Sequence, residues 1–129
     1  MSISIVQLGS PRGADEGLRI GTVRRPPRGV PKAEFARRDY YDTWLPQLAP
    51  SAELMAEGKS ATSEEDWARF ARHYRAEMSV ADTSRVLDLL AALSHGTHFA
   101  VGCYCEDEKR CHRSLLRELL TERGAVMRD

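Results

Sequence analysis

Three cysteines and a histidine near the end of the chain are the residues best suited to chemistry. Cys103, Cys105, Cys111 and His112 fall within ten residues, and Arg113 follows directly. Cys105 and Cys111 flank a polar loop that contains arginine. Basic neighbours and a helix N-terminus favour the thiolate, which is the nucleophilic form of cysteine. One thiolate would then attack an electrophilic centre, with His112 as acid or base and Arg113 stabilising the developing negative charge.

Acidic residues between the two cysteines have opposing effects on this chemistry. Glu106, with the two acidic residues that follow it, would raise the pKa of a neighbouring thiol. The same carboxylate could orient a histidine or serve as a general base. The candidate catalytic residues are therefore Cys111, His112 and Glu106.

The same side chains are also soft or borderline metal ligands, and Cys103 and Cys105 point to one side of a strand. Their spacing differs from that of zinc fingers and ribbons, and the adjacent Cys111 and His112 diverge on a helix. A chain of 129 residues can also bury a sufficient core without a structural metal. We predict no metal and no cofactor, with Cys103 a buried strand residue; a metal-binding or redox role of the cluster stays as an alternative.

A basic loop supplies the second group of candidate residues. Arg24, Arg25 and Arg28 surround two prolines that cannot continue a strand, and Ser10 ends the first apolar run. If the strands are parallel, their carboxyl ends and the first turn of the last helix meet on one rim, where backbone amides and arginines attract an anion. We predict an anion pocket whose substrate-binding residues are Arg24, Arg28, Arg113, Ser10 and Cys105.

The elements that would position these residues alternate between strands and helices. Short apolar runs predict strands within residues 3–6, 18–23 and 97–105. Apolar periodicity and capping residues predict four helices. The first begins at the Ser51 cap and ends before Gly58, and the second begins at Thr62 or Ser63 with a Thr62–Glu65 capping box. The third begins at Asp82 or Thr83, and the fourth runs from Cys111 to the terminating Gly124. This order predicts an α/β fold in which a small parallel or mixed sheet has helices on both faces, in a single domain of residues 1–129.

Composition limits the classes of partner. Lys plus Arg and Asp plus Glu both number 19, so the net charge is zero, which disfavours a dedicated nucleic-acid or membrane-surface binder. No apolar run has the length of a membrane span or signal peptide, so a cytoplasmic location is expected. The glycines form neither a dinucleotide fingerprint nor a nucleoside-triphosphate loop. We expect a small anionic ligand and no membrane, favour nucleic acid less, and leave the oligomeric state open.

Several motifs, in their order along the chain, resemble those of one family. They are RIGTVR (19–24), PRG (27–29), WLPQLAPS (44–51), Trp67, Phe70, Tyr74, Glu77, Cys105-Glu106 and CHRSLL (111–116). The series is similar to the bacterial and archaeal domain of unknown function 488 (DUF488), although Val23 and Pro26 depart from its YeaO-like branch. The resemblance implies a cytoplasmic α/β protein without a settled reaction, whose shared polar residues map to Arg24, Arg28, Trp44, Ser51, Tyr74, Glu106, Cys111, His112 and Arg113.

Two classes of function follow from these patterns, besides the metal or redox alternative. The leading hypothesis is an enzyme with an arginine-rich anion pocket, acting on a phosphorylated, nucleotide-like or acidic small molecule. The alternative is a non-catalytic nucleic-acid-binding or regulatory module that uses the basic segment 24–38. Binding through several backbone phosphates weakens steeply with salt, whereas binding of one anion does not, so ionic strength distinguishes the two.

Overall fold

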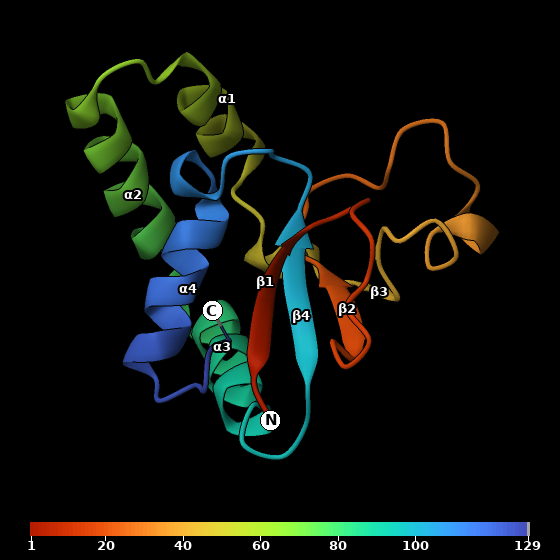
Figure 1. The fold of residues 1–129 in the computed structure, drawn as a ribbon. Helices are drawn as coiled ribbons and strands as arrows, with labels where there is room; N and C mark the ends of the chain where they lie inside the picture. Colours follow the sequence, from red (N-terminus) through yellow and green to blue (C-terminus); the bar gives the residue numbers. More distant parts are fainter. Residues whose placement is uncertain (129) are drawn as a thin grey trace.

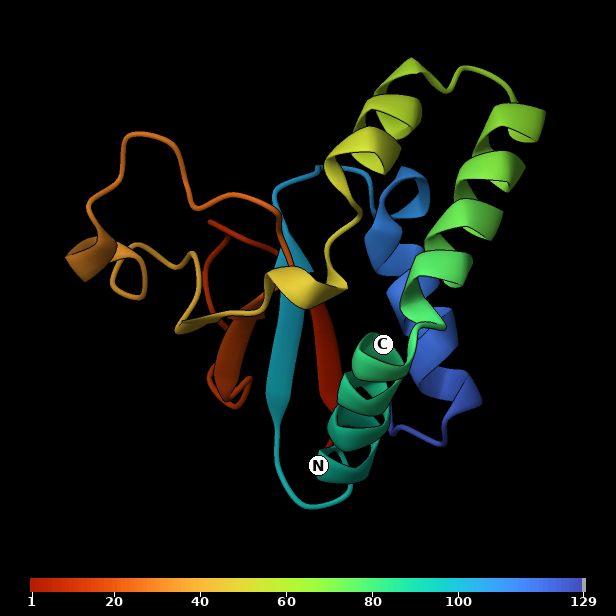
Figure 2. The same cartoon turned by 180° about the vertical axis from the view of Figure 1, so that it is seen from behind.

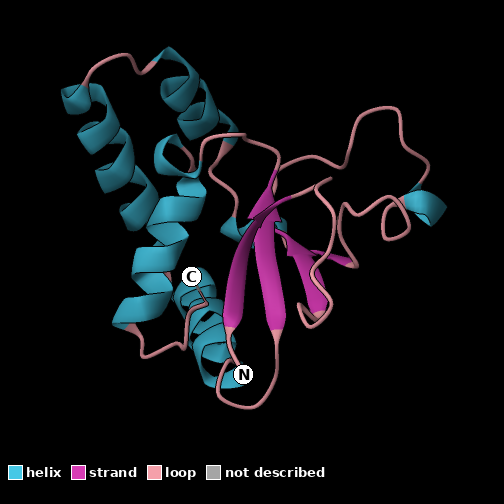
Figure 3. Ribbon diagram, in the orientation of Figure 1, coloured by secondary structure: helices cyan, strands magenta, loops and turns pink. Residues whose placement is uncertain are grey.

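A single sheet of four parallel strands forms the centre of the computed structural model, which describes residues 1–128 (Figures 1 and 3). The strands are β1 (Ile3–Gln7), β2 (Leu18–Gly21), β3 (Thr43–Trp44) and β4 (Phe99–Cys103), in the spatial order β1-β4-β2-β3. All five residues of β4 are buried, as the nearly continuous apolar run predicts for a central strand. Met127, which lies outside the four strands, makes one further parallel bridge to Ile3 of β1.

The α-helices lie between β3 and β4 and after β4, whereas a short 3-10 helix, Lys32–Glu34, lies between β2 and β3. The α-helices are α1 (Ala52–Ser60), α2 (Glu64–Met78), α3 (Ala81–Leu93) and α4 (His112–Glu122). The predicted α/β fold of a single domain is therefore confirmed, with a sheet that is wholly parallel. Among residues 1–128, no helix combines the length and the apolar character needed to cross a membrane.

The predicted helix boundaries need three corrections. Helix α1 continues through Gly58 to Ser60, so it does not end before Gly58. The capping box of α2 pairs Ser63 with Asp66, so Thr62 lies outside it. Helix α3 begins before both predicted caps, at Ala81, and the Thr83 hydroxyl instead donates to backbone carbonyls of the preceding turn. Gly124 follows α4 with φ of 84°, the left-handed conformation that makes glycine a helix terminator.

The α-helices gather on one face of the sheet, whereas the sequence analysis expected them on both. Ile3, Ile20, Phe99 and Val101 share one core with buried residues from all four helices, and Figure 2 shows α3 in front of this face. Right-handed crossovers explain the arrangement. The connections from β3 to β4 and from β4 to the Met127 bridge run in one direction across the sheet and carry the helices. Those from β1 to β2 and from β2 to β3 run the opposite way, so they cover the other face as loops.

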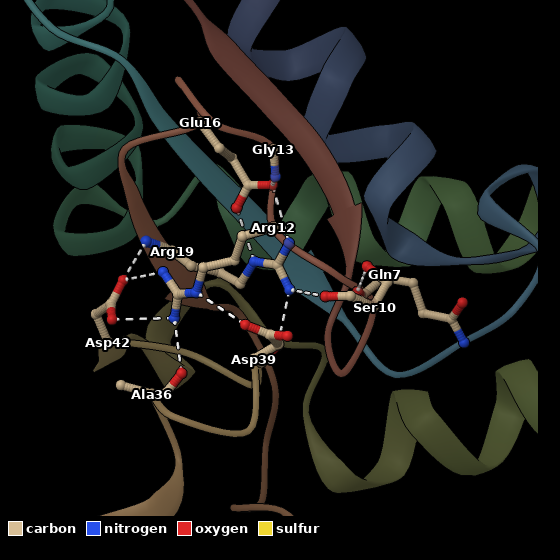
Figure 4. Close-up of polar contacts among 9 residues, drawn as sticks. All are labelled: Gln7, Ser10, Arg12, Gly13, Glu16, Arg19, Ala36, Asp39 and Asp42. Atoms are coloured by element: carbon tan, nitrogen blue, oxygen red, sulfur yellow. Dashed lines mark hydrogen bonds and ion pairs between the residues drawn. The ribbon is translucent and has the colours of Figure 1, made fainter.

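A buried polar network holds these loops against the sheet (Figure 4). Arg19 of β2 is fully buried, and its guanidinium forms two hydrogen bonds to Glu16, at 2.8 and 2.9 Å. It also donates to the carbonyls of Ser10 and Asp39, while its backbone NH donates to Asp42. The buried guanidinium, with all these partners, connects the loops on this face to β2, where no α-helix of residues 1–128 covers the sheet.

Candidate active site

The carboxyl ends of β2 and β4 lie side by side and open into a cavity of about 490 Å³. Gly21 of β2 pairs with Gly102 of β4, so the residues that follow the two strands are neighbours. The basic loop after β2 forms one wall, and α1 forms another through Met55 and Lys59. Cys103, Cys105 and His112 also line the cavity. This is the sheet edge at which open α/β proteins bind ligands.

The charged residues that line the cavity are all cationic. They are Arg24, Arg25, Arg28 and Lys59, and none of them forms an ion pair with a carboxylate of residues 1–128. Arg24 is fixed in place because its guanidinium donates to the carbonyls of Pro50, at 3.0 Å, and of Ala49, at 3.2 Å. The other three side chains are exposed. A cavity with this lining attracts anions, although the chain as a whole is neutral.

The three thiols form one cluster at the cavity. Cys105 is exposed, while Cys103 and Cys111 are buried with their sulfur atoms 2.7 Å apart. Hydrogen bonds from Cys103 and Cys111, together with the charge of Arg113, hold the pKa of Cys105 well below the ordinary thiol value. The hydrogen bonds to Cys105 and Cys111, with burial, raise the pKa of Cys103. Of the three thiols, Cys105 is therefore the one that ionises most readily, and it is also the one that solvent and ligands can reach.

His112 is buried beneath the cavity at the start of α4, with 6% of its surface exposed. Its Nε2 lies 2.8 Å from the carbonyl oxygen of Thr22, which can only accept a hydrogen bond, so Nε2 carries the proton. Burial lowers the pKa of His112 to about 4. The neutral ring then presents the lone pair of Nδ1 to the sulfur of Cys111, 3.7 Å away. Nδ1 of His112 is thus oriented to accept a hydrogen bond from the Cys111 thiol.

This burial predicts a pH-dependent stability. His112 ionises near pH 6.5 when unfolded and near pH 4 when folded, so the unfolded state binds more protons between these values and stability falls as the pH falls. The contribution is complete above pH 6.5 and lost below pH 4, and amounts to about 3 kcal/mol. Urea unfolding of the wild type and of His112→Gln, with chelator present, should show a stability difference that shrinks by this amount from pH 7 to pH 4. A difference that stays constant with pH would contradict the assignment.

Arg113 is a buried cation without a carboxylate partner. Only 3% of its surface is exposed, and no Asp or Glu of residues 1–128 forms an ion pair with it. One terminal nitrogen donates to the carbonyl of Cys105 at 2.5 Å, and its buried Nε has no hydrogen-bond partner. A buried charge needs compensation. The Cys105 thiolate, whose pKa responds to Arg113, supplies it.

Comparison with known proteins places the chain in a family. The family model described as the active DUF488-N3 subclade matches residues 3–124. The chain belongs to the DUF488 family. The resemblance of its motifs to this family is confirmed, while no curated protein and no solved structure matches this DUF488 protein.

Only some of the predicted site residues of this DUF488 protein meet at the cavity. Arg24, Arg28, Cys105 and His112 line it. Cys111 and Arg113 lie behind its surface because the first turn of α4 packs into the interior.

Two other predicted residues lie apart from the cavity. Glu106 is exposed on the loop after β4 and is not among the residues that line it. Ser10 belongs to the network of Figure 4, where its carbonyl accepts from Arg19 and its hydroxyl donates to the carbonyl of Gln7. The loop after β1 turns toward Arg19 on the helix-free face, which takes Ser10 away from the cavity.

The sequence analysis missed the contribution of α1 to the site. Met55 and Lys59 are four residues apart on one face of this helix, and both line the cavity. Ser51 caps the helix, and its hydroxyl and backbone NH both donate to Glu77 of α2. The cap was recognisable from sequence, but its hydrogen bonds to Glu77 were not. These bonds determine the position of α1.

Proposed function

We propose that this DUF488 protein is an enzyme that binds a phosphorylated, nucleotide-like or acidic small molecule in the cavity and reacts with it through the Cys105 thiolate. The observation that carries this proposal is the lining, which combines four cations, no carboxylate and an exposed thiol. The description of the matching subclade as active is consistent with catalysis. Three free cysteines suit the cytoplasm, where thiols stay reduced, and we propose that location.

Each residue has a distinct role in this proposal. Arg28, Arg25 and Lys59 contact the anionic group, because their charged ends are exposed and unpaired within residues 1–128. The Cys105 thiolate attacks the electrophilic centre of the ligand; as the bond from sulfur forms, the bond from that centre to its leaving group breaks, and the leaving group takes a proton from water. Cys111 and His112 act from behind as positioning residues that keep the charge of the thiol cluster on Cys105.

Calorimetry with inorganic phosphate and sulfate at several salt concentrations tests the binding step. We expect one anion per chain and an affinity that changes only shallowly with ionic strength, because one small site releases few counterions. Failure of both anions to bind or to raise the melting temperature would refute the proposal. Tight binding of an oligonucleotide with a steep salt dependence would favour the nucleic-acid module instead.

Thiol reactivity provides a second test. We predict that iodoacetamide modifies Cys105 first, more than about tenfold faster than Cys103 or Cys111, because it alone combines exposure with a lowered pKa. Mass spectrometry of peptides after brief alkylation gives the order directly. Faster modification of Cys103 would mean that the end of β4 faces solvent in solution.

A second candidate function is metal binding through the thiol cluster. Cys103, Cys111 and His112 offer ligand atoms within 4.8 Å of one another, and Cys105 adjoins them. The hydrogen bond from His112 to a backbone carbonyl is the outer contact that metal-binding histidines usually make. Cys103, Cys111 and His112 would supply two thiolates and a ring nitrogen, ligand types that suit Zn²⁺. Titration with Zn²⁺, followed by the melting temperature and by thiol accessibility, tests this candidate.

The fold itself is predicted not to depend on a metal. One core joins the sheet to all four α-helices without any contribution from the cysteines. Incubation with a strong chelator should therefore leave the melting temperature unchanged within about 2 °C, a shift that corresponds to less than 1 kcal/mol for a chain of this length. Stoichiometric zinc in the purified protein, with unfolding after its removal, would contradict this prediction.

A further inference from the structure

A second cavity of about 360 Å³ adjoins the first. Its walls are Arg25, Pro26, Pro27, Arg28, Tyr40 and Tyr104. Three of these residues, Arg25, Arg28 and Tyr104, also line the first cavity, so the two cavities share a boundary. The ligand can therefore be larger than a single anionic group.

The chemistry of the second cavity differs from that of the first. Tyr40 and Tyr104 contribute two aromatic rings, with centroids 6.3 Å apart and planes at 72°. A flat group stacked on one ring would meet the edge of the other, and both contacts are favourable for π systems. The prolines add apolar surface, and the two arginines offer flat cations that also stack on aromatic ligands.

Both tyrosines are fixed by other parts of the fold. The hydroxyl of Tyr104 donates to the carbonyl of Arg25 at 2.9 Å, and the Tyr104 carbonyl accepts from Gln7. The ring of Tyr40 packs on Gly9, where a Cβ atom would lie 3.3 Å from it. The walls are thus preorganised, which lowers the entropic cost of holding a ligand against them.

We infer that the ligand is a nucleotide, with its phosphate in the first cavity and its base in the second. The inference rests on the proposed function, because it requires the first cavity to hold the phosphate. Arg25 and Arg28 lie at the junction, where the phosphate and the base of one molecule would meet. A sugar phosphate or a small acid would leave the aromatic walls unused. The zero net charge of the chain favours a single nucleotide over a longer nucleic acid.

Calorimetry with adenosine 5′-monophosphate, ribose 5-phosphate and inorganic phosphate separates the two cavities. We expect the nucleotide to bind roughly 5- to 150-fold more tightly than ribose 5-phosphate, the range that stacking on an aromatic side chain provides. Tyr40→Leu should remove most of this advantage and leave the affinity for ribose 5-phosphate unchanged, because Tyr40 lines the second cavity and not the first. Tyr40→Phe keeps the ring and should retain the advantage, which makes it the matched control.

The outcomes distinguish this inference from the proposed function. Equal affinities for the nucleotide and ribose 5-phosphate would overturn the base site and leave anion binding intact. Absence of binding by all three phosphates would overturn both. An affinity for single-stranded oligonucleotides that rises with length and falls steeply with salt would overturn the mononucleotide in favour of nucleic acid. A Tyr40→Leu variant that loses ribose 5-phosphate binding equally would show that Tyr40 does not act on the base.

Discussion

Replacing Arg113 with methionine is expected to raise the pKa of Cys105 by roughly one to three units, the effect of losing a nearby opposite charge. The largest contributions to the lowered pKa of Cys105 come from Cys103 and Cys111, and both residues remain in the variant. Methionine keeps much of the apolar stem of arginine, and removal of a buried cation without a carboxylate partner carries little cost to folding. The change should therefore act on thiol reactivity more than on stability. The pH dependence of Cys105 alkylation, with thiolate absorbance as a second readout, measures it.

Arg117→Met provides the matched control for this experiment. Arg117 lies on the same helix, one turn later, and pairs with Glu108 near the surface. Its loss should leave the titration of Cys105 unchanged, because Arg117 is paired with Glu108 and is not among the charges that shift the pKa of Cys105. If Arg113→Met and Arg117→Met gave the same profile as the wild type, Arg113 would have no part in holding the thiolate.

Replacing Arg28 with glutamine is expected to weaken phosphate binding by about 1 to 3 kcal/mol, which is roughly 5- to 150-fold in affinity. Arg28 lines both cavities and its side chain is exposed, so it can donate to a bound anion without breaking an existing ion pair. Arg28→Lys should lose part of the affinity, because lysine keeps the charge and lacks the planar pair of donors. Calorimetry with inorganic phosphate at fixed ionic strength gives the values.

Arg37→Gln serves as the control for loss of a positive charge. Arg37 is an exposed arginine of the same long loop, pairs with Glu34, and lies outside both cavities. Its substitution should change phosphate affinity by less than about twofold, the range of a screened surface charge. Equal losses in Arg28→Gln and Arg37→Gln would show that net charge, and not a built site, attracts the anion.

Local patterns in the sequence were sufficient to predict where the site lies. The apolar run before Cys103 identified a central strand. Neighbouring parallel strands have their carboxyl ends at the same edge of the sheet, independently of the other elements of the fold. That rule alone brought Arg24, Arg28 and Cys105 to one edge of the sheet. The helix from Cys111 to Gly124 was equally local, since it depends on periodicity and on a terminating glycine.

The remaining features depend on contacts between distant segments. Arg113 was expected to share a ligand with Arg28, but it faces the interior because the first turn of α4 packs against the end of β4. The placement of all α-helices on one face follows from strand order, which no local pattern reveals. Likewise, α1 lines the cavity because Ser51 is hydrogen-bonded to Glu77, 26 residues further along the chain.

The central claim is that the cavity at the carboxyl ends of β2 and β4 binds an anion beside Cys105. A crystal structure of the protein grown with phosphate tests it most directly, because the position of the ion is observed together with its partners. We expect a phosphate in this cavity with its oxygens about 2.7 to 2.9 Å from the guanidinium of Arg28. A phosphate bound only at a site remote from Arg28 and Cys105, with the cavity holding none, would contradict it.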